Sequence, residues 1–137
     1  MTRLLLLGLL LASVGCSSKA PTGQISGSVT FKGSPVPAGE VTFTPDVTIA
    51  NGQVRQYVIK EGKYDSSANP DDGLLPGRYR VRIAGYDGKQ VPMFYSGKQI
   101  FNAIEQDVDI GLETVTKDFV VPESAGENIQ YIETADF

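Results

Sequence analysis

Histidine is absent from the 137-residue sequence, and cysteine occurs once, at position 16. Without histidine the chain has no Ser-His-Asp triad and no histidine metal site. With Cys16 as its only thiol, it forms no internal disulfide and no cluster of thiolates around a metal. We therefore expect a fold that rests on its own hydrophobic core, with no cofactor, no metal and no catalytic residues.

Apolar runs long enough to cross a membrane are lacking as well. Residues 4–11 are apolar apart from Gly8, but a membrane-spanning helix needs about 20 such residues. Arg3 precedes this run and small residues follow it. A basic end, an apolar stretch and a small-residue cleavage site are typical of a secretory signal peptide, which we expect over residues 1–15.

The lone cysteine ends this leader. The stretch Ser13-Val14-Gly15-Cys16 resembles the lipobox of a bacterial lipoprotein, although Ser13 stands where leucine is usual. The resemblance implies cleavage between Gly15 and Cys16 and a lipid anchor on Cys16. It also implies the outer membrane over the inner one, because Ser17 is not the aspartate that typically retains such proteins. The alternative is an ordinary signal peptide with an incidental cysteine, which would leave an odd free thiol in an oxidising compartment.

Net charge and turn residues narrow the class of protein further. The formal charge is −4, which argues against general nucleic-acid binding because that relies on Lys and Arg at phosphates. From position 105 onward acidic residues dominate and Lys117 is the only base. Fifteen glycines and eight prolines indicate many short strands joined by tight turns.

Alternation of apolar and polar residues predicts three half-buried strands, in residues 25–31, 40–45 and 76–85. Two dipeptides predict hairpin turns: Asn51-Gly52, with arms over 47–49 and 54–59, and Glu61-Gly62. The inward faces are expected to carry Ile25, Gly27, Val29, Phe31, Val41, Phe43, Tyr79, Val81 and Ile83.

The remaining segments complete an all-β chain. We expect a short strand over 63–65, loops over 66–75 and 86–97, one helical turn over 100–104, and closing strands over 108–110 and 114–121. Seven or eight short strands with almost no helix favour a single antiparallel β-sandwich. The expected organisation is a signal peptide (1–15), a lipidated cysteine with its tether (16–23), a β-sandwich domain (24–121) and an acidic C-terminal tail (122–137).

Three stretches follow one another in the chain: ISGSVTFKGSPVPAGEVTF, EGKY and LLPGRYRVRI. Together they resemble the transthyretin-like or carboxypeptidase-regulatory-like β-sandwich, in particular small lipoproteins of the planctomycete type. In that family the pattern is K-G-x-P-V-P-x-G, D-G-x-Y and P-G-x-Y-x-V, and here Glu61 replaces the aspartate. The matching positions are Lys32, Gly33, Pro35, Val36, Pro37, Gly39, Glu61, Gly62, Tyr64, Pro76, Gly77, Tyr79 and Val81. The resemblance implies architecture more than activity, since related hydrolases of purine catabolism rely on histidines that this chain lacks.

Two sets of residues are candidate ligand contacts. Arg78, Arg80 and Arg82 share the outward face of one strand, where they could bind acidic glycans or phosphate. We favour a solvated face paired with the acidic C-terminal strands. Phe94 and Tyr95 lie with Tyr86 and Met93 in an aromatic-rich loop, which could stack on a sugar or anchor a partner. For this loop we predict burial at one end of the sandwich.

Clustered carboxylates suggest other chemistry only weakly. Asp65, Asp71 and Asp72 lie near a turn, and Asp107 and Asp109 flank one valine, but no calcium-loop spacing is present. Nothing singles out the acid and base of a glycoside hydrolase. We expect a non-enzymatic, lipid-anchored protein of the cell envelope with a structural, adhesive or protein-interaction role. The alternative is a small-ligand or glycan-binding module; nucleic acid is not an expected partner.

Overall fold

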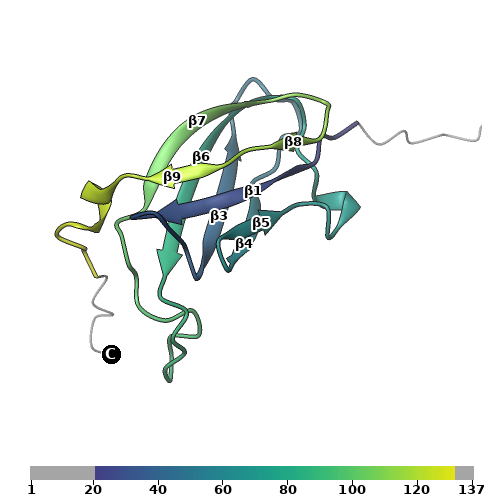
Figure 1. Cartoon of the computed structure of the whole chain (residues 1–137). Coiled ribbons are helices and arrows are strands. Elements are labelled where there is room, and N and C mark those ends of the chain that lie inside the picture. Colours follow the sequence, from purple (N-terminus) through teal and green to yellow (C-terminus); the bar gives the residue numbers. More distant parts are fainter. Residues whose placement is uncertain (1–20, 132–137) are drawn as a thin grey trace, which may run out of the picture.

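The computed structural model describes residues 21–131, which form an all-β domain (Figure 1). Helical structure in these residues is limited to two short 3-10 turns, η1 (Pro70–Asp72) and η2 (Glu123–Gly126). The prediction of an all-β chain is therefore confirmed. The strands are β1 (Ile25–Phe31), β2 (Ser34–Pro35), β3 (Ala38–Pro45), β4 (Arg55–Lys60), β5 (Lys63–Asp65), β6 (Gly77–Tyr86), β7 (Ile104–Ile110), β8 (Val115–Thr116) and β9 (Phe119–Val121).

These strands form one curled sheet with the order β2-β1-β5-β4-β3-β6-β7. Neighbours along this path are antiparallel, whereas β8 and β9 pair with β1 in parallel. Figure 1 shows β1, β8 and β9 crossing in front of β3 and β6. The hydrophobic core lies inside this curl.

The predicted inward faces supply most of that core. Of the nine residues expected to face inward on the first three predicted strands, seven are buried. Gly27 and Phe31 are half-buried, and Phe31 packs against the core. The centre is aromatic: the ring of Phe43 lies 5.6 Å from Tyr57, 6.4 Å from Tyr64 and 6.3 Å from Tyr79, measured between centroids. Such pairs stabilise a core beyond the area that they bury.

Each of the three core tyrosines also fixes a loop. Their hydroxyls donate hydrogen bonds to the backbone carbonyls of Asp72, Lys117 and Leu75, from Tyr57, Tyr64 and Tyr79 respectively. The Tyr79 bond returns to a residue four positions upstream, at 2.9 Å, which is the arrangement of a tyrosine corner. The hydroxyls thus have partners although the rings are buried, and the loops after η1 and β8 are held to the core.

Two tight turns have the backbone that their sequences require. Lys32-Gly33 joins β1 to β2, and Glu61-Gly62 joins β4 to β5. All four residues have positive φ, between 49° and 76°. Positive φ at both central positions is the type I′ geometry that two-residue hairpins favour.

The predicted hairpin turn at Asn51-Gly52 is wrong. β3 ends at Pro45 and β4 begins at Arg55, so the dipeptide lies inside a long loop and residues 47–49 form no strand. Register explains the difference: Phe43 pairs with Arg55 and Val41 with Tyr57, which aligns the buried residues of both strands. The core therefore sets the pairing and leaves the dipeptide outside it.

The predicted helical turn over 100–104 is also wrong. Ile100 donates its backbone N–H to Gly85 at 3.0 Å, and β7 already begins at Ile104. Phe101 is buried against Gly85, where any Cβ would overlap its ring. The segment before β7 is thus fixed by the contact of Phe101 with Gly85 of β6, and it forms no helical turn.

The closing strand predicted over 114–121 consists of two short strands, β8 and β9, separated by Lys117 and Asp118. The carbonyl of Lys117 lies so close to Gly27 of β1 that a Cβ there would overlap it. Asp118 accepts hydrogen bonds from the backbone N–H and hydroxyl of Ser28, both at 2.8 Å. Gly27 is thus the position on β1 where the residues between β8 and β9 make their closest approach.

Part of the acidic tail docks on the domain through Asn102. The Asn102 backbone N–H donates to Ala125 at 2.7 Å, and its side-chain amide donates to Glu127 and Asn128. Its side-chain oxygen accepts from the backbone N–H of Gln130 at 3.0 Å. No residue from 122 to 131 adds a strand to the sheet.

Candidate functional site

The arginine stripe lies on the outward face of β6, and acidic side chains lie beside it. Arg78 is 3.6 Å from Asp109, and Arg80 is 3.6 Å from Asp107, both on β7. Arg82 lies opposite Glu105 on β7 and forms a pair with Glu40 of β3, at 3.9 Å. The cross-strand ion pairs that we favoured for this face are therefore present at the first two arginines.

These pairs limit what the stripe can bind. A shallow hollow of about 360 Å³ lies beside it, lined by Thr44, Pro45, Asp46, Val47, Arg78, Arg80 and Asp107. The carboxylates of Asp46 and Asp107 face the same space as the arginines, so an anion entering it would meet charge of both signs. Hydrogen bonds from Thr48 lower the pKa of Asp46, first among them the bond from its backbone N–H. The stripe is thus a mixed-charge surface and not a bare cationic strip.

The aromatic-rich loop joins β6 to β7 and projects beyond the ends of the strands (Figure 1). Its neck is fixed by Asp87, whose carboxylate accepts from the backbone N–H groups of Lys89 at 2.9 Å and Lys98 at 3.0 Å. The first of these bonds is the main reason why the pKa of Asp87 is lowered. Gly97 fits beside Asp87 and Lys89, where a Cβ would overlap them. The neck of the loop therefore has a defined conformation, held by the Asp87 hydrogen bonds and by the close packing of Gly97.

The prediction that this loop is buried is wrong. Met93 is 86% exposed, Phe94 54% and Tyr95 82%, while Tyr86 is half-buried where β6 ends. The end of the core that the loop was expected to cover is closed by Phe101 instead. Phe94 and Tyr95 therefore lie together on this projecting loop. The arginine stripe is on a different surface, formed by the preceding strand β6.

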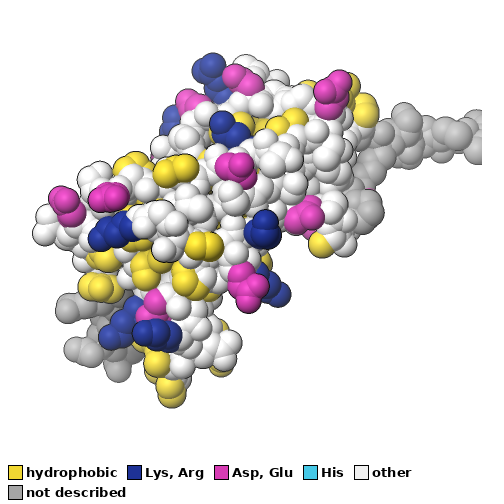
Figure 2. All heavy atoms as spheres, in the orientation of Figure 1, with side chains coloured by type: hydrophobic (Ala, Val, Ile, Leu, Met, Phe, Trp, Pro, Cys, Tyr) yellow, Lys and Arg dark blue, Asp and Glu magenta, His cyan; other side chains and the backbone are white. Residues whose placement is uncertain are grey.

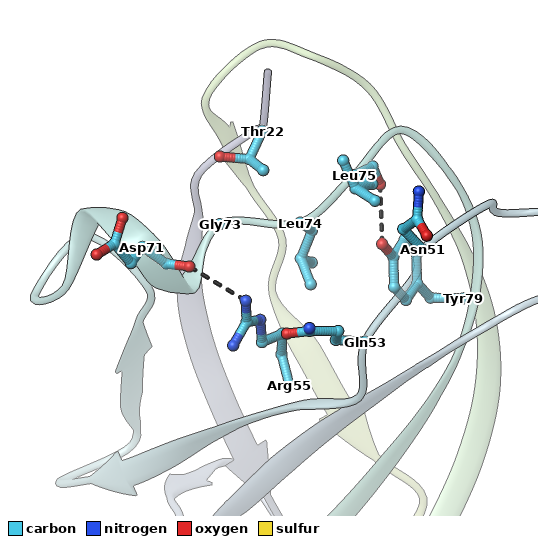
Figure 3. Close-up of a pocket in the computed structure, with 9 residues that line it drawn as sticks. All are labelled: Thr22, Asn51, Gln53, Arg55, Asp71, Gly73, Leu74, Leu75 and Tyr79. Atoms are coloured by element: carbon cyan, nitrogen blue, oxygen red, sulfur yellow. Dashed lines mark hydrogen bonds between the residues drawn. The ribbon is translucent and has the colours of Figure 1, made fainter. Parts of the chain in front are cut away.

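A second hollow, of about 250 Å³, lies where β6 begins (Figure 3). Arg55 reaches into it, donates to the backbone carbonyl of Asp71 at 3.2 Å and lies 3.5 Å from the carboxylate of Asp72. Its charge is therefore matched by η1, which it holds in place. The lining residues are Thr22, Asn51, Gln53, Arg55, Asp71, Gly73, Leu74, Leu75 and Tyr79. No sequence pattern predicted this hollow, because its walls come from four separate segments.

The clustered aspartates are not assembled into a metal site. No group of three potential ligands of the Asp, Glu, His or Cys type is close enough to hold a metal ion among residues 21–131. Asp65 accepts from the backbone N–H of Ser67 at 2.7 Å, which closes a turn, and hydrogen bonds from Ser67 lower its pKa. The carboxylates at 107 and 109 pair with arginines as described above.

The predicted lipidation site lies in a different part of the chain. Gly15, Cys16 and the leader fall outside the described residues, as does Phe137 at the other end. Within the described part, no helix is long and apolar enough to cross a membrane. Of the predicted site residues, the structure thus places the three arginines and the two aromatic residues.

Comparison of the chain with protein-family models found no match, and comparison with curated proteins found none either.

Proposed function

We propose that this chain is a non-enzymatic, lipid-anchored β-sandwich protein of the bacterial cell envelope, with a structural, adhesive or protein-interaction role. The observation that carries the anchor is Cys16 itself: the only thiol of the chain ends a signal-like leader and shortly precedes the folded domain. Acylation turns an otherwise unexplained free cysteine into a membrane attachment. By the same resemblance, we assign the outer membrane over the inner one.

For the fold we propose the transthyretin-like sandwich, and contacts between the motif stretches support this. Gly62 donates its backbone N–H to Val36 at 2.7 Å and accepts from Val29 at 2.8 Å, while Glu61 donates to Pro37 at 3.0 Å. The first two stretches of the resemblance are therefore in direct contact. In the third, Pro76-Gly77 leads into the tyrosine corner of Tyr79. Tyr64 and Tyr79 fill the core and Lys32-Gly33 and Glu61-Gly62 form tight turns, which favours a shared architecture over a shared active site.

Replacing the cysteine tests the anchor. Wild-type chain produced in a bacterial host should carry diacylglyceryl lipid on Cys16 by mass spectrometry, and it should stay with membranes after a high-salt wash. Cys16→Ala should lack the lipid and leave the membrane fraction with an unchanged thermal midpoint. Ser17→Ala is the matched control and should behave as wild type. A wild-type protein without lipid mass, or a Cys16→Ala protein that resists the salt wash, contradicts the proposal.

The second candidate is a glycan- or small-ligand-binding module, and one observation favours it. Tyr95 presents an exposed aromatic ring, the type of surface on which a sugar can stack. Retention of the protein on cell-wall glycan should then be lost in Tyr95→Ala and kept in Tyr131→Ala, whose ring is also exposed. Equal retention of both variants would remove Tyr95 as the contact.

A further inference from the structure

The tip of the β6–β7 loop is apolar over five consecutive positions: Val91, Pro92, Met93, Phe94 and Tyr95. All five are exposed. Soluble proteins scatter exposed apolar residues, whereas a contiguous group of them marks an interaction site. Because successive side chains of a tight turn point in different directions, this apolar tip is apolar on several sides and not on one face only.

The backbone of the apolar tip is already hydrogen-bonded to itself. Val91 and Phe94 exchange two bonds, at 3.3 and 2.9 Å, and Gly97 donates to the carbonyl of Phe94 at 3.1 Å. Lower in the loop, Gly88 donates to Ser96 at 3.0 Å. Burying a peptide group without a partner is costly, so a tip that bonds internally can leave water at little expense.

Charge is segregated around the same loop. The chain has 16 acidic residues, yet residues 88–104 contain none and carry only Lys89 and Lys98, both exposed. Figure 2 shows basic side chains directly above the hydrophobic tip at the lower end of the domain. The one acid at the neck, Asp87, is held by two backbone N–H groups. Two lysines beside an apolar tip are complementary to an anionic surface with an apolar interior.

We propose that the apolar tip inserts into the interfacial region of an anionic lipid bilayer, with Lys89 and Lys98 at the phosphates. A bilayer surrounds an inserted side chain with apolar groups in every direction, which suits a projection that is apolar on several sides. Tyr and Phe are suited to the depth where headgroups meet acyl chains. The two lysines add electrostatic attraction to anionic headgroups. This contact does not depend on lipid at Cys16, so it goes beyond the proposed anchor.

A single tryptophan tests insertion, because the chain contains no tryptophan of its own. The probe is the full chain with Cys16→Ala and Phe94→Trp, mixed with vesicles of phosphatidylcholine containing phosphatidylglycerol. We expect a blue shift of emission and quenching by lipids brominated on their acyl chains. The matched control is Val58→Trp in the same background, at an exposed apolar position on β4. Both proteins share the leader, so a difference between them comes from the loop.

Charge and apolar variants measure the two parts of the contact. In the probe background, Lys89→Gln with Lys98→Gln should weaken binding to anionic vesicles roughly tenfold, and little in pure phosphatidylcholine. Met93→Ser should weaken it roughly tenfold in both, by removing a large apolar side chain. A thermal midpoint near that of wild type shows that each variant is folded.

Three outcomes would overturn the proposal. The tryptophan at position 94 could stay unquenched in every vesicle, or the control at position 58 could be quenched equally, which indicates general adsorption. Alternatively, emission could change only when cell-wall glycan or an envelope protein is added. The last result would assign the tip to that partner and not to lipid.

Discussion

Raising the pH above 10 should destabilise this domain, and its buried tyrosines set how steeply the free energy of unfolding falls. Tyr57, Tyr64 and Tyr79 are almost inaccessible to solvent, and each donates its hydroxyl to a backbone carbonyl. Burial raises the pKa of all three above the ordinary value of 10, because a phenolate would lose its hydration. Ionisation would also remove the proton that each hydroxyl donates.

The magnitude follows from proton linkage. In the unfolded chain these phenols ionise near pH 10, so above that pH the folded state binds more protons and the free energy of unfolding falls. Each phenol that stays protonated lowers it by about 1.4 kcal/mol for every pH unit. Tyr57 and Tyr64 together lower it by about 2.7 kcal/mol per unit, and Tyr79 acts in the same direction. This stabilisation is fully present below pH 10 and is lost as the pH rises toward the folded-state pKa values.

A loss of this size is decisive for a small domain, whose stability is typically about 5–15 kcal/mol. The assay is urea unfolding from about pH 8 to about pH 11, with tyrosinate absorbance recorded beside circular dichroism. The tyrosinate absorbance of the three buried tyrosines should appear only as the β-structure is lost, because their phenols stay protonated in the folded state. Tyr57→Phe should reduce the slope by about 1.4 kcal/mol per pH unit, whereas Val58→Ala on the same strand should not. A free energy of unfolding that stays level above pH 10, or an unchanged slope in Tyr57→Phe, would refute the reasoning.

Three further substitutions test other parts of the structure. Gly27→Ala should destabilise the domain by about 1–3 kcal/mol in denaturant titrations, because its Cβ would overlap the carbonyl of Lys117. Arg80→Gln should change stability by less than about 0.5 kcal/mol at any salt concentration, since its pair with Asp107 is exposed to solvent. Asn102→Ala should speed amide hydrogen exchange in residues 125–130, with a global loss of about 1–2 kcal/mol, because this side chain makes three of the bonds that hold the segment.

Period-two alternation predicted the strands that form the core. Val41 and Phe43 on β3, and Tyr79 and Val81 on β6, are buried as expected, since one face of each strand must leave water. Glu61-Gly62 was predicted as a turn, and both residues have the positive φ of a two-residue hairpin. Sequence patterns are therefore sufficient to predict a strand, its buried face or a turn where these depend on residues close together in the sequence.

Prediction failed where distant residues decide. Asn51-Gly52 carries the same turn signal as Glu61-Gly62, but the pairing of Phe43 with Arg55 leaves it within a loop. Phe101 is buried because it fills the space beside Gly85, and nothing near Phe101 in the sequence indicates that space. Burial of Phe43 was predicted from strand alternation, whereas burial of Phe94 was predicted only from an aromatic-rich loop expected to cover one end of the sandwich. Phe94 stays exposed because Phe101 already closes the end of the core that the loop was expected to cover.

The exposed tip and the first described residues of the chain lie at opposite ends of β6. Gly23 pairs with Leu74 just before β6 begins, while the loop leaves where it ends, about 33 Å away for ten extended residues. The seven residues from 17 to 23 span at most about 25 Å, so an anchor at Cys16 holds the start of β6 near its membrane. Tip and anchor can then share one bilayer only if the domain lies along it, because an upright domain would hold the tip away from that bilayer. Lipid on Cys16 would decide which membrane the protein occupies, and the loop would decide how the domain is oriented there. The two contacts are separable by mutation, because Cys16 is not one of the residues of the apolar tip.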